Sequence, residues 1–388
     1  MSYSKIDVPA PAASADVALA DSAWMLDRLE ALCAHDTTTG REDAGLPALL
    51  SLLRELDADV ALTAVAPGRS NVLATWGDPE LVFSTHLDTV PPFLPPRLHA
   101  NGAGAELSGR GTCDAKGQVV CQLAAIRALL RRADFGPGRR GLAWLAVVGE
   151  ETDSDGAKHA AATLPAFRAA RALINGEPTG GRLATGQRGS LQLALRTHGV
   201  AAHSGTPERG RSAIWPLLDW LERLRELPPR RDEALGEEIW NLGLIEGGSA
   251  LNVVPAAARA QLFVRTVPGS EFLEGARRLA PGAGDGDGAI DVLARSEPDR
   301  FPALAGFAAA PVPFGSDAPR LRALVPDRTV VLAGPGAIEL AHSADERITT
   351  AELAAGLDLN LRLASRLLGL DAARPAARAE RAAAGETA

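Results

Sequence analysis

A histidine and an aspartate lie two positions apart directly after an apolar stretch. His86 and Asp88 follow the run Leu81–Ser84 within STHLDT. Side chains two apart on a strand point to the same side, so Asp88 can hold one ring nitrogen of His86 and turn the other toward a metal ion. A His–Asp pair at a strand end, with no catalytic meaning, is the ordinary alternative.

A glycine-flanked turn places a single carboxylate ahead of a predicted helix. In GRGTCDAKG, Asp114 precedes the apolar run Val119–Leu130. An aspartate in this place is often only the N-cap of the helix. The two oxygens of a carboxylate can also bridge two cations held about 3.5–4 Å apart. Both interpretations stay open from the spacing alone.

Two adjacent acids, Glu150 and Glu151, follow the apolar run Leu142–Val148. Adjacent carboxylates repel each other, so at the mouth of a buried strand they need a cation or a proton to compensate. Solvated surface acids are the ordinary alternative. Beside a metal ion, one carboxylate binds the ion while the other takes a proton from a water molecule that the ion polarises. We expect Glu151 to be the ligand and Glu150 the general base.

Two further candidates follow later apolar stretches. Glu177 comes directly after Ile174–Gly176, and His342 follows the glycine-rich turn Gly334–Gly336. Taken alone, His342 is more often a hydrogen-bonded surface histidine than a ligand. Nitrogen and oxygen donors without cysteine suit zinc, cobalt or manganese. The sequence therefore predicts a metal centre built from His86, Asp114, Glu151, Glu177 and His342.

The elements that must position these residues alternate between strand and helix. This alternation predicts an α/β fold with a mainly parallel sheet and helices on both faces, and such sheets bind ligands beyond the carboxyl ends of their strands. Apolar spacing predicts strands at Asn71–Trp76, Leu81–Ser84, Leu142–Val148 and Thr329–Leu332, and helices at Ala23–Cys33, Leu46–Leu56 and Val119–Leu130.

From about Arg188 the pattern changes to a βαββαβ order, which predicts an inserted, ferredoxin-like α+β domain. We expect a discontinuous domain over 20–187 and 299–370 that carries the candidate ligands, an inserted domain over 188–298, and flexible termini at 1–19 and 371–388. The insert has predicted strands at Ser190–Thr197, Trp240–Glu246, Arg259–Thr266 and Ala289–Leu293, helices at Ala213–Leu227 and Glu271–Leu279, and a surface turn at Pro281–Gly288.

Composition excludes several function classes. A chain of 388 residues is long enough for two domains, and its net charge of −8 disfavours a nucleic-acid surface. No apolar run reaches the roughly 18 residues of a membrane span, and no secretory signal is recognisable. Three cysteines are too few for a disulfide framework. We expect a cytoplasmic protein that acts on a small molecule.

A G-x-S-x-G elbow and a Walker A sequence are both absent, which disfavours serine hydrolases and nucleotide enzymes.

The runs STHLDTVP, GRGTCDAKGQ, VVGEET, NGEPT and GPGAIELAHSADE occur in this order over about residues 25–368. Jointly they resemble the motifs of the dinuclear zinc amidohydrolases and exopeptidases that include acetylornithine deacetylase, succinyl-diaminopimelate desuccinylase, aminoacylase and glutamate carboxypeptidase. The resemblance implies two Zn²⁺ per chain, with Co²⁺ as a possible substitute. It implies that Asp114 bridges them, that His86 and Glu177 complete one site and that Glu151 and His342 complete the other, with Glu150 as the base.

The inserted segment carries further resemblances. GVAAHSG is similar to the lid motif whose histidine, in relatives, reaches the active site of a dimer partner and steadies the oxyanion. The resemblance therefore implies that 188–298 is a lid and dimerisation domain inserted into the catalytic domain, and that the protein is a homodimer in which His203 acts in trans. Asn252 and Arg265 resemble contacts to a substrate carboxylate, for which a planar guanidinium is suited, although ordinary strand-end polar residues are the alternative. Gly334 is expected to contact the substrate as well.

The resemblance is closest to acetylornithine deacetylase in GPGAIELAH, and Glu177 in place of Asp also favours the deacetylase side. It implies a deacylase that cleaves the amide bond of an N-acyl amino acid. A dipeptidase or carboxypeptidase of the same family is the alternative, and a catalytically silent metal-binding or interaction protein is the alternative of another class. The segment Phe301–Pro313 is shorter than in these relatives, which leaves the pocket wall and the substrate open.

Overall fold

The computed structural model describes residues 15–101, 104–136, 138–282 and 286–370. The chain divides into two compact units, one holding the chain up to Arg182 and again from Arg320, and the other holding Leu183–Pro319. The segment predicted as an insertion, 188–298, lies inside the second unit. The predicted flexible termini lie outside the described residues, apart from 15–19, which form the start of a helix.

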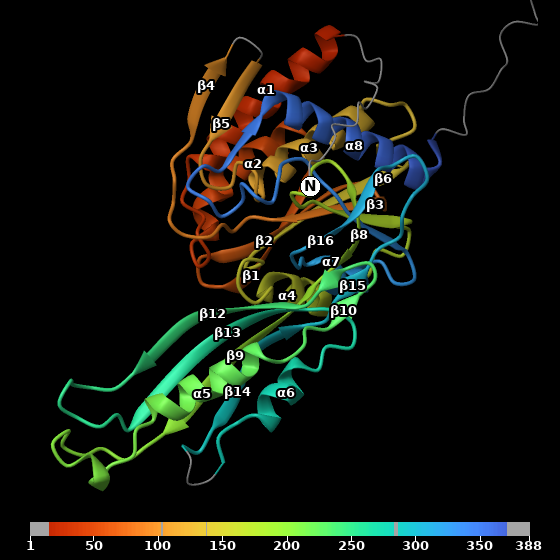
Figure 1. The fold of residues 1–388 in the computed structure, drawn as a ribbon. Coiled ribbons are helices and arrows are strands. Elements are labelled where there is room, and N and C mark those ends of the chain that lie inside the picture. Colours follow the sequence, from red (N-terminus) through yellow and green to blue (C-terminus); the bar gives the residue numbers. More distant parts are fainter. Residues whose placement is uncertain (1–14, 102–103, 137, 283–285, 371–388) are drawn as a thin grey trace, which may run out of the picture. The chain divides into compact units, whose positions relative to one another are not determined.

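A six-stranded mixed sheet forms the centre of the first unit (Figure 1). Four neighbouring strands run parallel, and two antiparallel strands complete one edge. The parallel strands can be buried on both faces because their central residues are apolar, as in the runs Leu81–Phe83 and Leu142–Val147. The strand order is β1 (Asp59–Ala66), β2 (Arg69–Trp76), β6 (Gly141–Val147), β3 (Pro79–His86), β7 (Ala172–Asn175) and β17 (Thr329–Leu332).

Helices cover this sheet on both sides, which confirms the predicted fold class (Figure 1). Three of them pack against one another on one face, and α4 packs on β1, β2 and β6. The helices are α1 (Ala15–Cys33), α2 (Leu46–Glu55), α3 (Lys116–Leu130), α4 (Asp155–Thr163), α7 (Ala318–Leu321) and α8 (Thr350–Leu368), with 3₁₀ turns at Glu42–Gly45 and Arg322–Leu324; α1, α3 and α8 form the packed trio.

A small three-stranded sheet joins two distant parts of the first unit. The hairpin of β4 (Arg97–Asn101) and β5 (Gly104–Ser108) pairs with β18 (Arg347–Thr349). In this pairing Arg347 lies opposite Ser108. The turn that follows β5 is therefore held beside the loop that precedes β18.

The second unit has the predicted βαββαβ order, with an antiparallel sheet arranged β12-β13-β9-β14. Burial alternates along β13 because one face of the sheet packs against the helices, around Trp220 and Phe272. The elements are β9 (Gly189–His198), α5 (Ile214–Arg225), β12 (Ile239–Gly247), β13 (Ala257–Thr266), α6 (Phe272–Arg278) and β14 (Ala289–Ser296).

Short elements complete the second unit. They are β8 (Leu183–Gln187), β10 (Arg231–Asp232), β11 (Gly236–Glu237), β15 (Asp299–Arg300), β16 (Ala309–Val312) and a 3₁₀ turn at Pro207–Arg209. The predicted turn Pro281–Gly288 lies partly outside the described residues. Among the helices that the structure describes, none has the length and apolar character needed to cross a membrane.

Candidate metal centre

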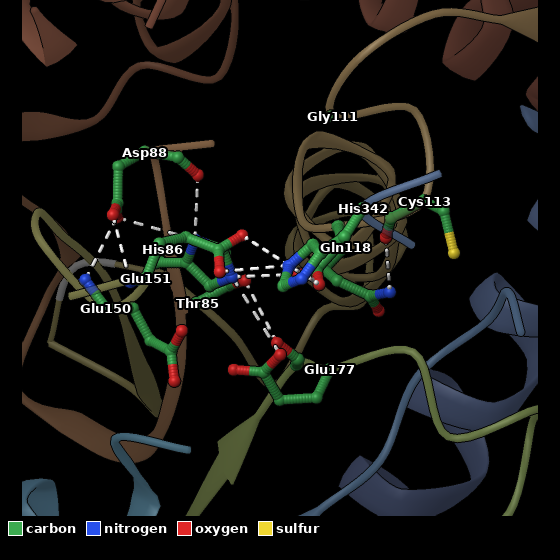
Figure 2. A network of polar contacts seen from close by, with 12 residues as sticks. Thr85, His86, Asp88, Gly111, Cys113, Gln118, Glu150, Glu151, Glu177 and His342 are labelled. Atoms are coloured by element: carbon green, nitrogen blue, oxygen red, sulfur yellow. Dashed lines mark hydrogen bonds and ion pairs between the residues drawn. The ribbon is translucent and has the colours of Figure 1, made fainter. Parts of the chain in front are cut away.

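The predicted ligands meet beyond the carboxyl ends of the parallel strands, and four of them are labelled in Figure 2: His86, Glu151, Glu177 and His342. His86 is the last residue of β3, Glu150 and Glu151 follow β6, and Glu177 follows β7. Parallel strands that end at one edge bring such residues together although they are far apart in the chain. His342 reaches the same place from the loop after β17, where its backbone is left-handed with φ 64°.

Two groups of donor atoms share one carboxylate. His86, Asp114 and Glu177 form the first group, and Asp114, Glu151 and His342 form the second. In each group the donor atoms lie within 4.8 Å of one another. The structure thus brings all five predicted ligands into one cluster, divided as the resemblance implies.

The two oxygens of Asp114 face different groups. Oδ1 lies 3.0 Å from Nε2 of His86, which in turn lies 3.8 Å from a carboxylate oxygen of Glu177. Oδ2 lies 3.4 Å from Nε2 of His342, which lies 3.0 Å from Glu151. A carboxylate shared in this way is suited to bridging two cations.

Asp114 is not the N-cap of the helix that follows it. Helix α3 begins at Lys116 with Ala115 as its N-cap, and no side chain forms a capping hydrogen bond there. The Asp114 side chain points instead toward the two histidines. The Asp114 carboxylate therefore belongs to the cluster of predicted ligands and does not cap the helix.

The cluster places three carboxylates beside only two histidines, and this proximity shifts the pKa values of its members. Burial raises the pKa of Glu151, and the charge of Asp114 raises it further. Burial opposes the charged forms of Asp114 and His86, but polar contacts outweigh it. Hydrogen bonds with His342 and His86 lower the pKa of Asp114, and hydrogen bonds with Asp114 and Asp88 raise the pKa of His86. Hydrogen bonds with Asp114 and Glu151 raise the pKa of His342 to about 10.

These shifts have one physical meaning. Three carboxylates within a few ångströms are tolerated only if protons on the histidines, or cations in their place, neutralise them. Divalent cations bind such a set by displacing those protons. The donor chemistry of the five residues therefore fits a pair of divalent metal ions.

Asp88 contacts the cluster in a way that the sequence did not reveal. Its backbone carbonyl, not its carboxylate, is the nearer partner of His86 Nδ1, at 2.9 Å against 3.5 Å. The fully buried carboxylate instead accepts the backbone N–H groups of Glu150, at 3.1 Å, and Glu151, at 3.0 Å. Figure 2 shows Asp88 joined to both. Asp88 thus fixes the backbone that carries the predicted base and one predicted ligand.

Sequence reasoning also missed Gln118, a buried residue in the first turn of α3. Its amide nitrogen donates to the carbonyls of Cys113, at 3.2 Å, and Pro335, at 2.8 Å. The side chain thereby ties the turn of Asp114 to the loop after β17. The available signal was a glutamine, the last residue of the run GRGTCDAKGQ, in the first turn of a predominantly apolar helix.

Gly334, the predicted substrate contact, lies against the Glu177 loop. Its N–H donates to the hydroxyl of Thr179 at 3.0 Å, and an added Cβ would collide with Gln118 and with the Glu177 carbonyl. Only glycine fits here. Its contact with the substrate stays a prediction.

The predicted lid residues fall into two places within the second unit. His203 pairs with Val253 in an isolated bridge, and Ser204 N–H donates to the Asn252 carbonyl at 2.9 Å, so His203 and Asn252 are neighbours. Arg265 lies near the opposite end of β13, with its guanidinium 4.5 Å from the Phe263 ring centroid. The roles of these three residues stay predictions.

Comparisons with known proteins agree with this architecture. Residues 185–280 match the family model described as the peptidase dimerisation domain of the M20 family. An M20 peptidase domain-containing protein of Schizosaccharomyces pombe is 35% identical over 297 residues, covering 75% of this chain and 70% of that protein. A probable carboxypeptidase of Aspergillus oryzae is 36% identical over 326 residues, covering 74% and 75%.

Solved structures show the same fold. A tripeptidase of Staphylococcus aureus superposes with a TM-score of 0.71 at 20% identity, covering 89% of this chain and 99% of that one. An M20 family metallo-carboxypeptidase of Sulfolobus solfataricus superposes with a TM-score of 0.65 at 16% identity, covering 88% and 97%.

Proposed function

The chain belongs to the M20 metallopeptidase family, and from this premise we propose that it is a dinuclear zinc hydrolase that releases an amino acid with a free α-carboxylate from an acyl or peptidyl group. The observation that carries the proposal is the placement of the Asp114 oxygens, one toward each donor group. His86 and Glu177 would complete one zinc site, and Glu151 and His342 the other. Co²⁺ is the expected substitute.

The chemistry follows from the residues around these sites. When bound, the metal pair polarises the scissile carbonyl and makes a water molecule acidic enough to lose a proton near neutral pH. Glu150 takes that proton and later delivers it to the leaving amine. It is suited to this because its backbone is fixed by Asp88 next to Glu151, while its own carboxylate is outside both donor groups. Asp88 holds this arrangement in place.

Relatives named as probable carboxypeptidases favour a peptide on the acyl side of the cleaved bond. Hydrolysis of an N-acetyl amino acid breaks the same kind of amide bond, with a smaller acyl group. The deacylase resembling acetylornithine deacetylase is therefore the second candidate, supported by the GPGAIELAH motif. The two differ in what the acyl pocket accepts.

We also propose that the protein forms a homodimer through the second unit. The first support is that residues 185–280 match the peptidase dimerisation domain. Strand β12 is an edge of its sheet and exposes Ile239, Leu244 and Ile245. An exposed apolar edge strand is a template for pairing with another chain.

Distances along β13 give independent support. Asn252 comes five residues before this strand, whereas Arg265 is its ninth residue, and the eight steps from Ala257 to Arg265 alone span about 26 Å at the rise of an extended strand. The two cannot touch one small substrate from the same copy. If both bind substrate, His203 and Asn252 reach it from one protomer and Arg265 from its partner.

The test combines two measurements on the purified protein. Bound metal is counted by elemental analysis, and amine release is followed from N-acetyl, N-succinyl and dipeptide substrates with and without a chelator. About two zinc ions per chain and chelator-sensitive release from dipeptides support the carboxypeptidase. Release from N-acetyl amino acids alone favours the deacylase.

Two other results would count against the proposal. Protein that stays metal-free after exposure to zinc would refute the five-ligand centre. Protein that binds zinc and releases no amine from any substrate class would favour the catalytically silent, metal-binding alternative.

A further inference from the structure

A buried carboxylate outside the donor groups binds the turn that carries Asp114. Glu346 has a fully buried side chain, and its Oε1 accepts backbone N–H groups from Gly111 at 3.0 Å, Cys113 at 3.1 Å and Asp114 at 3.1 Å. Successive N–H groups that converge in this way form a concave anion site. Here the anion is a side chain of the same protein, and the turn is folded around it.

The other oxygen of Glu346 binds an equally buried arginine. Arg110 Nη1 lies 2.5 Å from Oε2 and also donates to the Ser343 carbonyl at 3.2 Å. Ser343 follows His342 directly, so Arg110 reaches the loop of a predicted ligand. The exposed fractions of the Arg110 and Glu346 side chains are 2% and 0%.

The two turns meet because of the small sheet. The pairing of β5 with β18 ends at Ser108 and Arg347, one step from Gly109 and Glu346, and Gly109 N–H donates to the Glu346 carbonyl at 2.9 Å. Glu346 and Arg110 continue this connection through side chains. Together they join the turn of Asp114 to the loop of His342.

We propose that Glu346, supported by Arg110, is a positioning residue that fixes the Asp114 turn so that each carboxylate oxygen faces its own metal site. The proposal rests on the metal centre proposed above. Glu346 itself binds no metal. It acts by holding three amide groups, and so the backbone from which the Asp114 side chain projects.

The test measures Zn²⁺ affinity of the full chain by competition with a chromophoric chelator, without substrate. Glu346→Ala removes the acceptor of all three amides. Because Asp114 is shared, both zinc sites should weaken, by about 10–100-fold, the usual effect of losing a residue that supports a metal ligand. Glu346→Gln keeps an amide-accepting oxygen but loses the ion pair with Arg110, so it should melt at a lower temperature and bind zinc within about threefold of wild type.

Leu129→Ala is the stability-matched control. Leu129 is buried near the far end of α3, about 20 Å from Asp114 along the helix. The cavity lowers the melting temperature without touching the turn, so zinc affinity should be unchanged. Glu346→Asp, whose shorter side chain cannot reach the amides as well, replaces the alanine variant if that variant does not fold, and it should also bind zinc more weakly.

Three results would overturn the proposal. In the first, Glu346→Ala binds zinc as tightly as wild type or loses no more affinity than Leu129→Ala. In the second, Glu346→Gln is as weak as Glu346→Ala, which would show that charge matters and amide bonding does not. In the third, wild-type protein binds no Zn²⁺, which removes the metal centre itself. Normal zinc affinity with no hydrolysis, by contrast, leaves the positioning role intact and counts only against the proposed function.

Discussion

Asp88→Asn tests whether the Asp88 carboxylate holds the backbone of Glu150 and Glu151. In the native protein, Oδ1 accepts from Glu150 N–H, and Oδ2 accepts from Glu151 N–H and the hydroxyl of Thr39 at 3.0 Å. Asparagine has the same shape but presents only one oxygen. Whichever way its amide turns, an NH₂ group faces one backbone N–H that needs an acceptor.

The size of the effect follows from this mismatch. A buried N–H without an acceptor costs about 1–3 kcal/mol, which corresponds to a fall in melting temperature of roughly 2–12 °C for a unit of this size. Displacing the Glu150 backbone should also lower kcat about 10–100-fold, as changes to groups that orient a metal site usually do. Thermal unfolding and steady-state kinetics on the best substrate of the panel measure the two effects.

Thr39→Val is the matched control. It removes one hydrogen bond to the same carboxylate but leaves both backbone N–H groups paired, so it should lose about 0.5–1.5 kcal/mol and keep kcat within about threefold. An Asp88→Asn protein with the melting temperature and kcat of wild type would refute the reasoning. If both variants lose kcat equally, the loss comes from the hydrogen bond of the Thr39 hydroxyl and not from displacement of the Glu150 backbone.

Three further predictions concern the base, the dimer and a buried acid. Glu150→Gln should keep both metals and lower kcat by at least about 100-fold; retained turnover with confirmed metal content would exclude it as the base. Mixing inactive Glu150→Gln and His203→Ala proteins should restore about a quarter of wild-type activity, since half the exchanged dimers hold one intact site; no recovery despite subunit exchange would contradict action in trans. Burial raises the pKa of Glu238, a hydrogen bond with Ser270 offsets this in part, and its Oε2 has no hydrogen-bond partner among the described residues, so the folded state favours the neutral acid. Glu238→Gln should therefore raise the melting temperature by roughly 1–3 °C at pH 7, with the gain shrinking as the pH falls through the raised pKa of the folded protein and lost below the ordinary glutamate pKa of 4.5; a gain that persists at pH 3.5 would show that charge is not its cause.

The sequence located the cluster because each candidate ligand follows a recognisable strand or turn. Runs such as Leu142–Val148 are too apolar for a surface strand, and parallel buried strands end at a common edge. The family, predicted from the motifs, and the α/β fold, predicted from the alternation of strands and helices, are both confirmed. A strongly apolar strand therefore predicts both its own burial and the position of the polar residue that follows it.

Contacts between distant segments could not be predicted in this way. Glu346 and Gly111 are far apart in the chain, and no local periodicity links them. The hairpin Arg97–Asn101 and Gly104–Ser108 has few apolar residues, so it gave no strand signal, although it brings those two segments together. The carboxylate of Asp88 bonds to amides that exist as partners only once β3 and β6 lie side by side.

The two donor groups differ in how far their side chains are exposed to solvent, and in the proposed dinuclear centre this difference would set the order in which ions exchange. The His86 side chain is 1% exposed and that of Glu177 is 4% exposed, whereas 49% of the His342 side chain is open. An ion beside His342 can leave through a histidine that swings outward, while one beside His86 must wait for a larger opening of the chain. The centre is therefore expected to fill from the inside and empty from the outside, and brief exposure to a chelator should yield a long-lived species with a single ion per chain.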